Sequence, residues 1–109
     1  MNFETRFNQV VSSWEIYCGS SAVQNNLASR TIGENYQNVV GLGPDAVELL
    51  FDRYGKRKEN TPVGVAWAKA IEDILQSEDP EFVIPRDIRY APEKVKEYIG
   101  DYLEKRRAK

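Results

Sequence analysis

The sequence predicts an all-α protein, a compact orthogonal bundle of five or six short helices. Over most of the chain, apolar residues recur every three or four positions, which is the spacing of one helix face. The alternation of apolar and polar residues that marks a strand is not sustained anywhere. The nearest candidates, residues 39–43 and 82–85, are short and are interrupted by glycine or proline.

Length and composition predict one helical domain over residues 1–109. An apolar share of 41% and a charged share of 29% are typical of globular proteins and exclude a largely disordered chain. No apolar run approaches the ~20 residues of a membrane span, and the first residues lack the apolar core of a signal peptide. A single cysteine excludes an internal disulfide. We therefore expect a cytoplasmic protein that does not enter a membrane.

The first predicted helix covers residues 3–18 and ends at Gly19. Ser21 with Gln24 matches a capping box and predicts a short helix through Leu27. The apolar face of the first helix comprises Phe3, Phe7, Val10, Val11, Trp14, Tyr17 and Cys18.

A third helix is predicted from a second capping box, formed by Thr31 and Glu34. It places Ile32, Tyr36, Val39 and Val40 toward the core. The expected core of the bundle is Phe7, Trp14, Tyr36, Val40, Leu50, Phe51, Trp67 and Ile71.

A tight corner is predicted between the third and fourth helices. Gly41 ends the third helix and is expected to adopt a positive φ. Leu42 is expected to be buried, and Gly43 to cap the next helix. Pro44 suits the first position of that helix, which runs to about Tyr54.

The C-terminal half predicts two further helices separated by an irregular connection. Thr61 and Pro62 start a helix that runs to about Gln76. Residues 77–90 contain two prolines and form the connection, and residues 91–107 form the last helix, with a frayed tail. The connection is expected to be anchored in the core by Phe82, Val83, Ile84 and Ile88. The apolar stripe of the last helix comprises Val95, Tyr98, Ile99, Tyr102 and Leu103. Gly100 lies off this stripe and destabilises the helix by ~1 kcal/mol relative to alanine.

Several short motifs occur in order along residues 7–75. They are Trp14-Glu15, Ser20-Ser21, Tyr36-Gln37 followed by Val39-Val40-Gly41-Leu42-Gly43, Ala46-Val47 followed by Leu49-Leu50, and Ala66-Trp67 followed by Ala70-Ile71. This order resembles a family of small, all-helical, largely uncharacterised prokaryotic proteins. Their pattern is W-E, S-S, a tyrosine ahead of I-I-x-x-G, a leucine-rich helix, and H-W-F-x-A-L-x-x-I-T. The resemblance implies a helical fold and a place in toxin–antitoxin-type gene pairs.

The chain departs from that family at two histidines. Glu34-Asn35 stands where the family has His-Pro, and Ala66-Trp67-Ala68 stands where it has His-Trp-Phe. If those histidines carry a shared activity, this chain has lost it.

Residue types exclude the common catalytic sites. Without histidine, the chain lacks the usual neutral-pH acid–base group, Ser-His and Cys-His pairs, and zinc sites built on His and Cys. Cys18 lies on an apolar face and is predicted to be a buried structural thiol. We therefore predict no enzyme activity and no cofactor or metal; an enzyme that uses carboxylates alone ranks last.

Three polar groups of residues have a structural explanation beside a functional one. Two carboxylate rows predict solvated helix faces rather than a site for a hard cation. The serine and amide side chains within residues 12–26 are expected to cap helices and form loop hydrogen bonds rather than to line a small polar pocket near Trp14 and Ser20. Gly41 to Pro44 lacks the lysine and serine of a phosphate loop. The carboxylate rows are Asp45, Glu48 and Asp52, and Glu93, Glu97, Asp101 and Glu104.

The predicted function is a non-enzymatic module that binds another protein. Tyr98 and Tyr102 are expected at the edge of the last helix, available to a protein partner or to a second copy in a homodimer. The alternative is a nucleic-acid accessory protein that uses the basic clusters 56–58 and 105–109. The net charge of −2 disfavours this alternative. Its contact residues would be Lys56, Arg57, Lys58, Lys105, Arg106 and Arg107.

Overall fold

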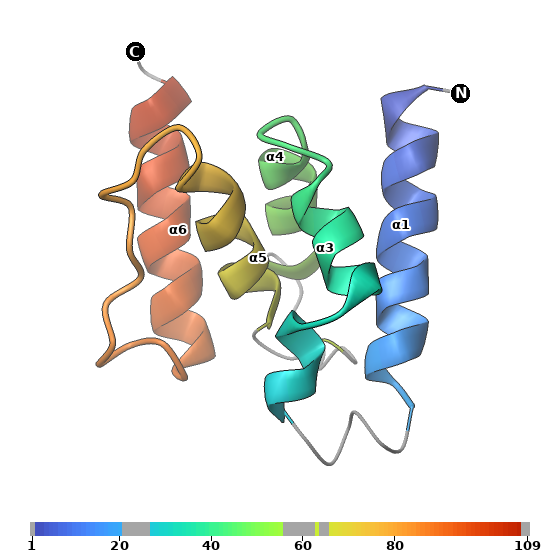
Figure 1. Cartoon of the computed structure of the whole chain (residues 1–109). Helices are drawn as coiled ribbons and strands as arrows, with labels where there is room; N and C mark the ends of the chain where they lie inside the picture. The colour runs from blue at the N-terminus through green and yellow to red at the C-terminus, as the bar shows by residue number, and fades with distance from the viewer. Residues whose placement is uncertain (1, 21–26, 56–62, 64–65, 108–109) are drawn as a thin grey trace.

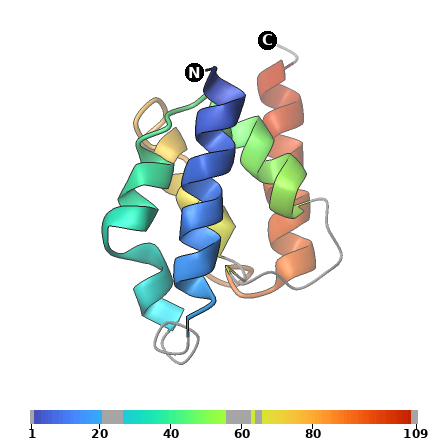
Figure 2. The same ribbon diagram turned by 90° about the vertical axis from the view of Figure 1, so that its right-hand side faces the viewer.

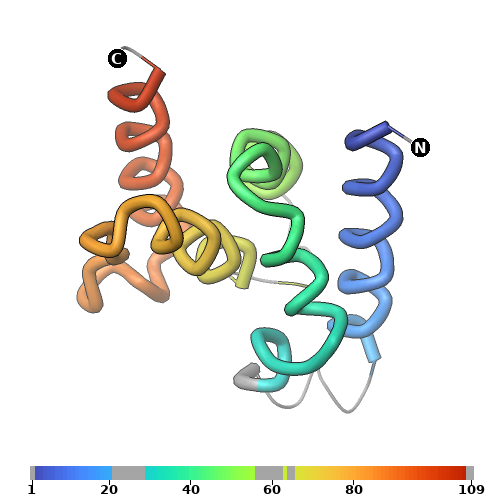
Figure 3. The backbone as a smooth tube through the Cα atoms, turned by 45° about the horizontal axis from the view of Figure 1, so that its top comes forward, coloured from blue at the N-terminus to red at the C-terminus, as the bar shows by residue number. Residues whose placement is uncertain are grey.

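The computed structural model describes residues 2–20, 27–55, 63 and 66–107, and within them the chain is all-α, without strands. α1 and α6 flank the molecule on opposite sides, with α3, α4 and α5 between them (Figures 1 and 3). The start of α1 and the end of α6 lie at the same end of the bundle (Figure 2). The elements are α1 (Phe3–Cys18), the 3₁₀ helix η1 (Leu27–Thr31), α3 (Glu34–Val40), α4 (Ala46–Leu50), the π-helical turn η2 (Phe51–Gly55), α5 (Ala66–Leu75) and α6 (Pro92–Arg107).

α1 has the predicted bounds. The Asn2 side chain caps its start by accepting a hydrogen bond from the Thr5 N–H at 2.8 Å, and the Gly19 N–H donates to the Glu15 carbonyl at its end. The predicted apolar face is confirmed, because Phe7, Val11, Trp14 and Cys18 are buried and Phe3, Val10 and Tyr17 pack against them. Arg53 of η2 pairs with Glu15, which ties α1 to η2.

The predicted capping box at the start of α3 is wrong. Thr31 belongs to η1, and the cap residue is Gly33, which makes no side-chain cap bond. Gly33 has φ +92° and ψ 178°, a conformation that is essentially restricted to glycine. The turn at Gly33 leaves Ile32 58% exposed, so its predicted inward position is also wrong. Tyr36 and Val39 are buried as predicted, and Val40 is partly buried.

The corner before α4 differs from the prediction in its backbone. Gly41 has φ −66°, and the left-handed residue is Gly43, with φ +84°. The reason is that the chain continues in a helical turn to Leu42, whose N–H donates to the Val39 carbonyl at 3.1 Å. Leu42 is buried as predicted. α4 begins at Ala46, so Pro44 precedes the helix by two residues instead of opening it.

Phe51 explains the glycine in α6. Its ring packs against Trp67 of α5, with centroids 6.2 Å apart. A Cβ added at Gly100 would lie 3.3 Å from Phe51 Cζ, so Gly100 lets α6 approach this ring closely. Gly100, which was expected to lie off the apolar stripe of this helix, therefore faces the Phe51 ring of another element.

α5 forms the centre of the core and α6 covers it from one side. Nearly every residue of α5 is buried, and Val95, Ile99 and Leu103 of α6 are at most 1% exposed, as the apolar stripe predicts. Phe82 and Ile84 anchor the connection as predicted, and Ile88 is partly buried; Val83 is 47% exposed, which contradicts the prediction for that residue. The predicted helix starts at Ser21 and at Thr61-Pro62 lie outside the described residues, as does the tail after residue 107. No helix in the described ranges is long and apolar enough to cross a membrane.

Candidate functional site

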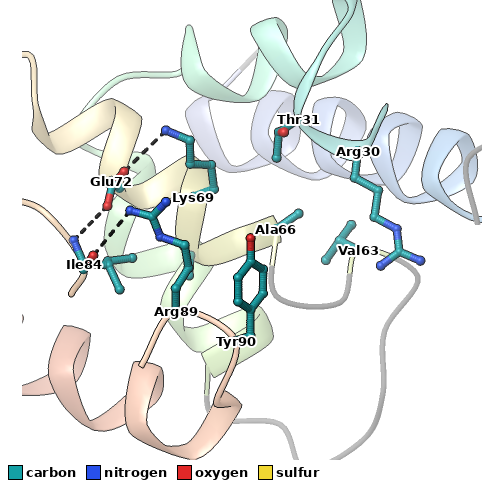
Figure 4. Close-up of a pocket in the computed structure, with 10 residues that line it drawn as sticks. Arg30, Thr31, Val63, Ala66, Lys69, Glu72, Ile84, Arg89 and Tyr90 are labelled. Atoms are coloured by element: carbon teal, nitrogen blue, oxygen red, sulfur yellow. Dashed lines mark hydrogen bonds and ion pairs between the residues drawn. The ribbon is translucent and has the colours of Figure 1, made fainter. Parts of the chain in front are cut away.

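A cavity of about 490 Å³ lies between η1, the first half of α5 and the connection of residues 76–91, which we call the strap (Figure 4). One wall is apolar and consists of Val63, Ala66, Ala68 and Ile84, all of them buried. The remaining lining is polar or charged. The volume of the cavity is in the range of ligand pockets. These polar lining residues are Arg30, Thr31, Lys69, Glu72, Arg89 and Tyr90.

Glu72 attaches the strap to α5. It is 4% exposed, and its Oε2 accepts a hydrogen bond from the Ile84 N–H at 2.8 Å. Its Oε1 lies 3.3 Å from Lys69 Nζ. Both oxygens of this buried carboxylate therefore have donors, which is what a buried charge requires.

Lys69 and Asp73 extend this network to α3. Lys69 Nζ donates to Asp73 Oδ1 at 2.8 Å, and Tyr36 of α3 donates its hydroxyl to the other oxygen of Asp73. The hydrogen bond to Asp73 raises the pKa of Lys69, and burial raises the pKa of Tyr36. Hydrogen bonds and ion pairs thus connect α3, α5 and the strap behind the cavity.

Arg30 and Arg89 are the two cavity cations without a carboxylate partner in the described residues. Arg89 Nη2 makes only a long contact of 3.4 Å to the Ile84 carbonyl, and the Nε of Arg30 is buried without a hydrogen-bond partner. Trp14 fixes the Arg30 backbone, since Trp14 Nε1 donates to the Arg30 carbonyl at 2.9 Å. In Figure 4 the two guanidinium groups lie apart, with Ala66 between them.

The charge of the cavity differs from that of the chain. The chain carries a net charge of −2, whereas three of the four charged lining residues are basic. Lys69 is compensated by Glu72 and Asp73, so that within the described ranges the uncompensated charges of the lining are those of Arg30 and Arg89. Such an arrangement can hold an anionic group beside an apolar one. Nowhere in the described ranges do three or more His, Cys, Asp or Glu side chains come together as a metal site.

The two tyrosines predicted to bind a partner lie at the edge of α6, half-buried, and both contact the strap. Their rings pack on Phe82, with centroids 5.9 Å away for Tyr98 and 4.5 Å for Tyr102. The Tyr98 hydroxyl donates to the Val83 carbonyl at 2.9 Å, and the Tyr102 hydroxyl donates to Asp79 at 3.3 Å. Their evident contribution is to hold the strap against α6.

The basic residues of the nucleic-acid alternative are in part paired within the chain. Arg106 forms an ion pair with Glu78 at 3.1 Å, and Arg107 donates through Nε to Glu48 at 3.0 Å. Lys105 is exposed. The other cluster, Lys56, Arg57 and Lys58, lies outside the described residues.

Cys18 is fully buried, as predicted, and burial raises the pKa of its thiol to about 11. A thiol reagent should therefore label the native protein slowly near pH 7 and the urea-unfolded protein quickly. The thiol of the unfolded chain has its ordinary pKa of 9.0, so it loses its proton at a lower pH than the thiol of the folded chain. The protonated, buried thiol therefore stabilises the fold fully below about pH 9, and this stabilisation is lost as the pH rises to about 11. Cys18→Ala should remove that part of the pH dependence. Rapid labelling of the native protein would contradict the structural role.

Glu72→Ala is expected to lower the free energy of unfolding by about 1–3 kcal/mol, because it leaves the buried Ile84 N–H without an acceptor. Urea denaturation followed by circular dichroism measures this. The matched control is Glu97→Ala on the exposed face of α6, which should stay within about 0.5 kcal/mol of the unaltered chain. Equal stabilities of the two variants would show that Glu72 does not hold the strap.

Sequence reasoning did not find this cavity. Its lining comes from residues 30–31, 63, 66–72 and 84–90, and no local pattern connects these segments. A usable signal was Arg89-Tyr90, a cation followed by an aromatic residue in an irregular connection.

The chain was compared with protein-family models, curated proteins and solved structures, and nothing matched in any of the three. The resemblance to the small helical prokaryotic family therefore stays a prediction that rests on the motifs alone. The function has to be argued from the cavity and its charges.

Proposed function

We propose that this chain is a non-enzymatic module that binds another protein, and that the partner docks at the cavity between α5, η1 and the strap. The observation that carries the proposal is the pair Arg30 and Arg89, two arginines that line an apolar-walled cavity and have no carboxylate partner in the described part of the chain. A guanidinium group that is partly removed from water and unpaired gains from a bound anion.

The state of the titratable groups favours binding over catalysis. Glu72 is the one carboxylate among the described lining residues, and both of its oxygens accept hydrogen bonds from the chain itself. Lys69 is held by two carboxylates, which favours its protonated form. Protonated Lys69 has no lone pair to accept a proton, and the hydrogen bonds to both oxygens of Glu72 stabilise its ionised form and weaken it as a base.

Exposed apolar side chains next to the cavity favour a macromolecular partner. Tyr90 lines the cavity and is 79% exposed, and Ile32, which follows the lining residue Thr31, is 58% exposed. A ligand confined to the cavity leaves most of this surface in water. A polypeptide that continues past the cavity covers it, and tyrosine and arginine are enriched in such interfaces.

The test is partner capture from the source cells, followed by calorimetry with the purified partner. Arg30→Gln/Arg89→Gln removes two charges at the cavity. Lys94→Gln/Lys105→Gln removes two from exposed positions of α6 that have no ion pair within the described ranges. We expect the first variant to weaken binding at least ~10-fold, about 1.4 kcal/mol, and the control to bind like the unaltered chain. Equal affinities of the two variants would place the interface elsewhere.

A further inference from the structure

We infer that the segment bound in the cavity is acidic, with a carboxylate side chain next to an apolar one. This inference rests on the proposed function and specifies the chemistry of the partner. It follows from three features of the lining: two arginines without carboxylate partners in the described residues, a buried apolar wall between them, and the carboxylate of Glu72, both of whose oxygens already accept hydrogen bonds from this chain.

The arginines determine the sign of the charge that the ligand must carry. A guanidinium group presents N–H donors in a planar fork that matches a carboxylate, and such charge-assisted pairs are about twice as strong as neutral hydrogen bonds. Arg30 carries a buried Nε–H that has no acceptor among the described residues, so the hydrogen-bonding capacity of this guanidinium group is not used up within them. A carboxylate in the cavity can accept hydrogen bonds from the terminal nitrogens of these guanidinium groups and compensate their charge.

The apolar wall determines what stands beside the carboxylate. Val63, Ala66 and Ala68 have short side chains, and their small size leaves the space that Ile84 borders from the strap. Glu72 is held back from this space by the Ile84 N–H and Lys69. One apolar side chain of a ligand can enter here, and its burial contributes roughly 25 cal/mol per Å² of apolar surface removed from water.

The same lining disfavours nucleic acid as the ligand. Phosphates also suit arginine, but affinity for a nucleic-acid backbone comes from a stripe of several cations, and this chain is acidic overall. Here two arginines that have no carboxylate partner in the part of the chain that the structure describes flank an apolar wall. Arg106 and Arg107, near the C-terminus, form ion pairs with Glu78 and Glu48. A short acidic and apolar segment fits this arrangement better than a polyanion.

The experiment measures the binding of capped, fluorescently labelled peptides to the full chain by fluorescence polarisation at low and high salt. One peptide set places Asp or Glu beside Leu or Phe. A second set replaces each acid by its amide, and a third replaces it by Lys. The variants are Arg30→Gln/Arg89→Gln, the single change Arg89→Gln, and the control Lys94→Gln/Lys105→Gln. Circular dichroism confirms that each variant is folded before binding is measured.

The acidic peptides should bind, and the amide set should bind at least ~10-fold more weakly, since a lost charge-assisted hydrogen bond is worth a factor of that order. Arg30→Gln/Arg89→Gln should lose the preference for acid over amide, Arg89→Gln should reduce it, and the control should keep it. High salt should weaken the acidic set selectively.

Two results separate the possible failures. If amide or lysine peptides bind as tightly as the acidic ones and compete with the purified partner, the acidic inference is overturned while the proposed function stands. If a single-stranded oligonucleotide or a medium-chain fatty acid binds in preference to every peptide, and binding is lost in Arg30→Gln/Arg89→Gln, both the inference and the proposed function are overturned.

Discussion

Replacing Trp14 by alanine should lower the free energy of unfolding by about 3–5 kcal/mol, the usual cost of truncating a large buried aromatic side chain. Trp14 is 0% exposed, and its ring packs against Tyr36 at 5.8 Å and Tyr54 at 6.3 Å. Small domains are stable by only about 5–15 kcal/mol, so this change removes a large part of the total. Urea denaturation followed by circular dichroism measures the loss.

Trp14 also connects the core to the cavity, which gives the prediction a second part. Trp14→Phe keeps most of the buried aromatic surface but removes the N–H that donates to the Arg30 carbonyl. It should cost less stability than Trp14→Ala and still weaken partner binding, because Arg30 loses its backbone anchor. Ile16→Ala, on the exposed side of the same helix at 78% exposure, is the control and should change stability by less than about 0.5 kcal/mol. A Trp14→Ala variant as stable as the Ile16→Ala control would contradict the packing described here.

Ile99→Ala in α6 should lower the free energy of unfolding by about 2–5 kcal/mol, because it opens a cavity at a fully buried position. Deleting residues 91–109 should have a larger effect, since it removes every α6 contact with the core and uncovers Phe82. Thermal melting followed by circular dichroism compares these variants with the full chain.

The control for Ile99→Ala lies on the same helix. Asp101→Ala changes an exposed position and should leave the melting temperature nearly unchanged. If the deletion left the melting temperature unchanged but abolished partner capture, α6 would be a binding element rather than part of the core. In that case Tyr98 and Tyr102 would regain the role that the sequence suggested for them.

Helices with a long apolar period could be predicted well. The bounds of α1 are those predicted, and α6 begins at Pro92 and buries Val95, Ile99 and Leu103 as its stripe requires. The sequence signals that predict both helices are local: the 3.6-residue apolar period and a residue that begins or ends the helix. Short helices gave less reliable results. Thr31 and Glu34 match a capping box, but this local match does not indicate that Thr31 belongs to η1 or that the chain turns at Gly33.

The cavity could not be predicted because it depends on contacts between distant parts of the chain. Glu72 meets the Ile84 N–H twelve residues away, and Tyr36 meets Asp73 thirty-seven residues away. The same holds for the basic C-terminus, where Arg107 is paired with Glu48 across fifty-nine residues. The sequence gives the position of every charge along the chain, but which charges remain unpaired is decided by the tertiary structure.

The most direct test of the docking site is an NMR titration of the ¹⁵N-labelled full chain with an acidic, apolar peptide that binds it. We expect the largest shifts at the backbone amides of Thr31, Lys69, Ile84 and Arg89, which line the cavity on three separate segments. Amides of Gln9 on α1 and Lys105 on α6 should hardly move. Shifts concentrated at residues 105–107, with the cavity amides unchanged, would contradict the assignment of this cavity as the binding site.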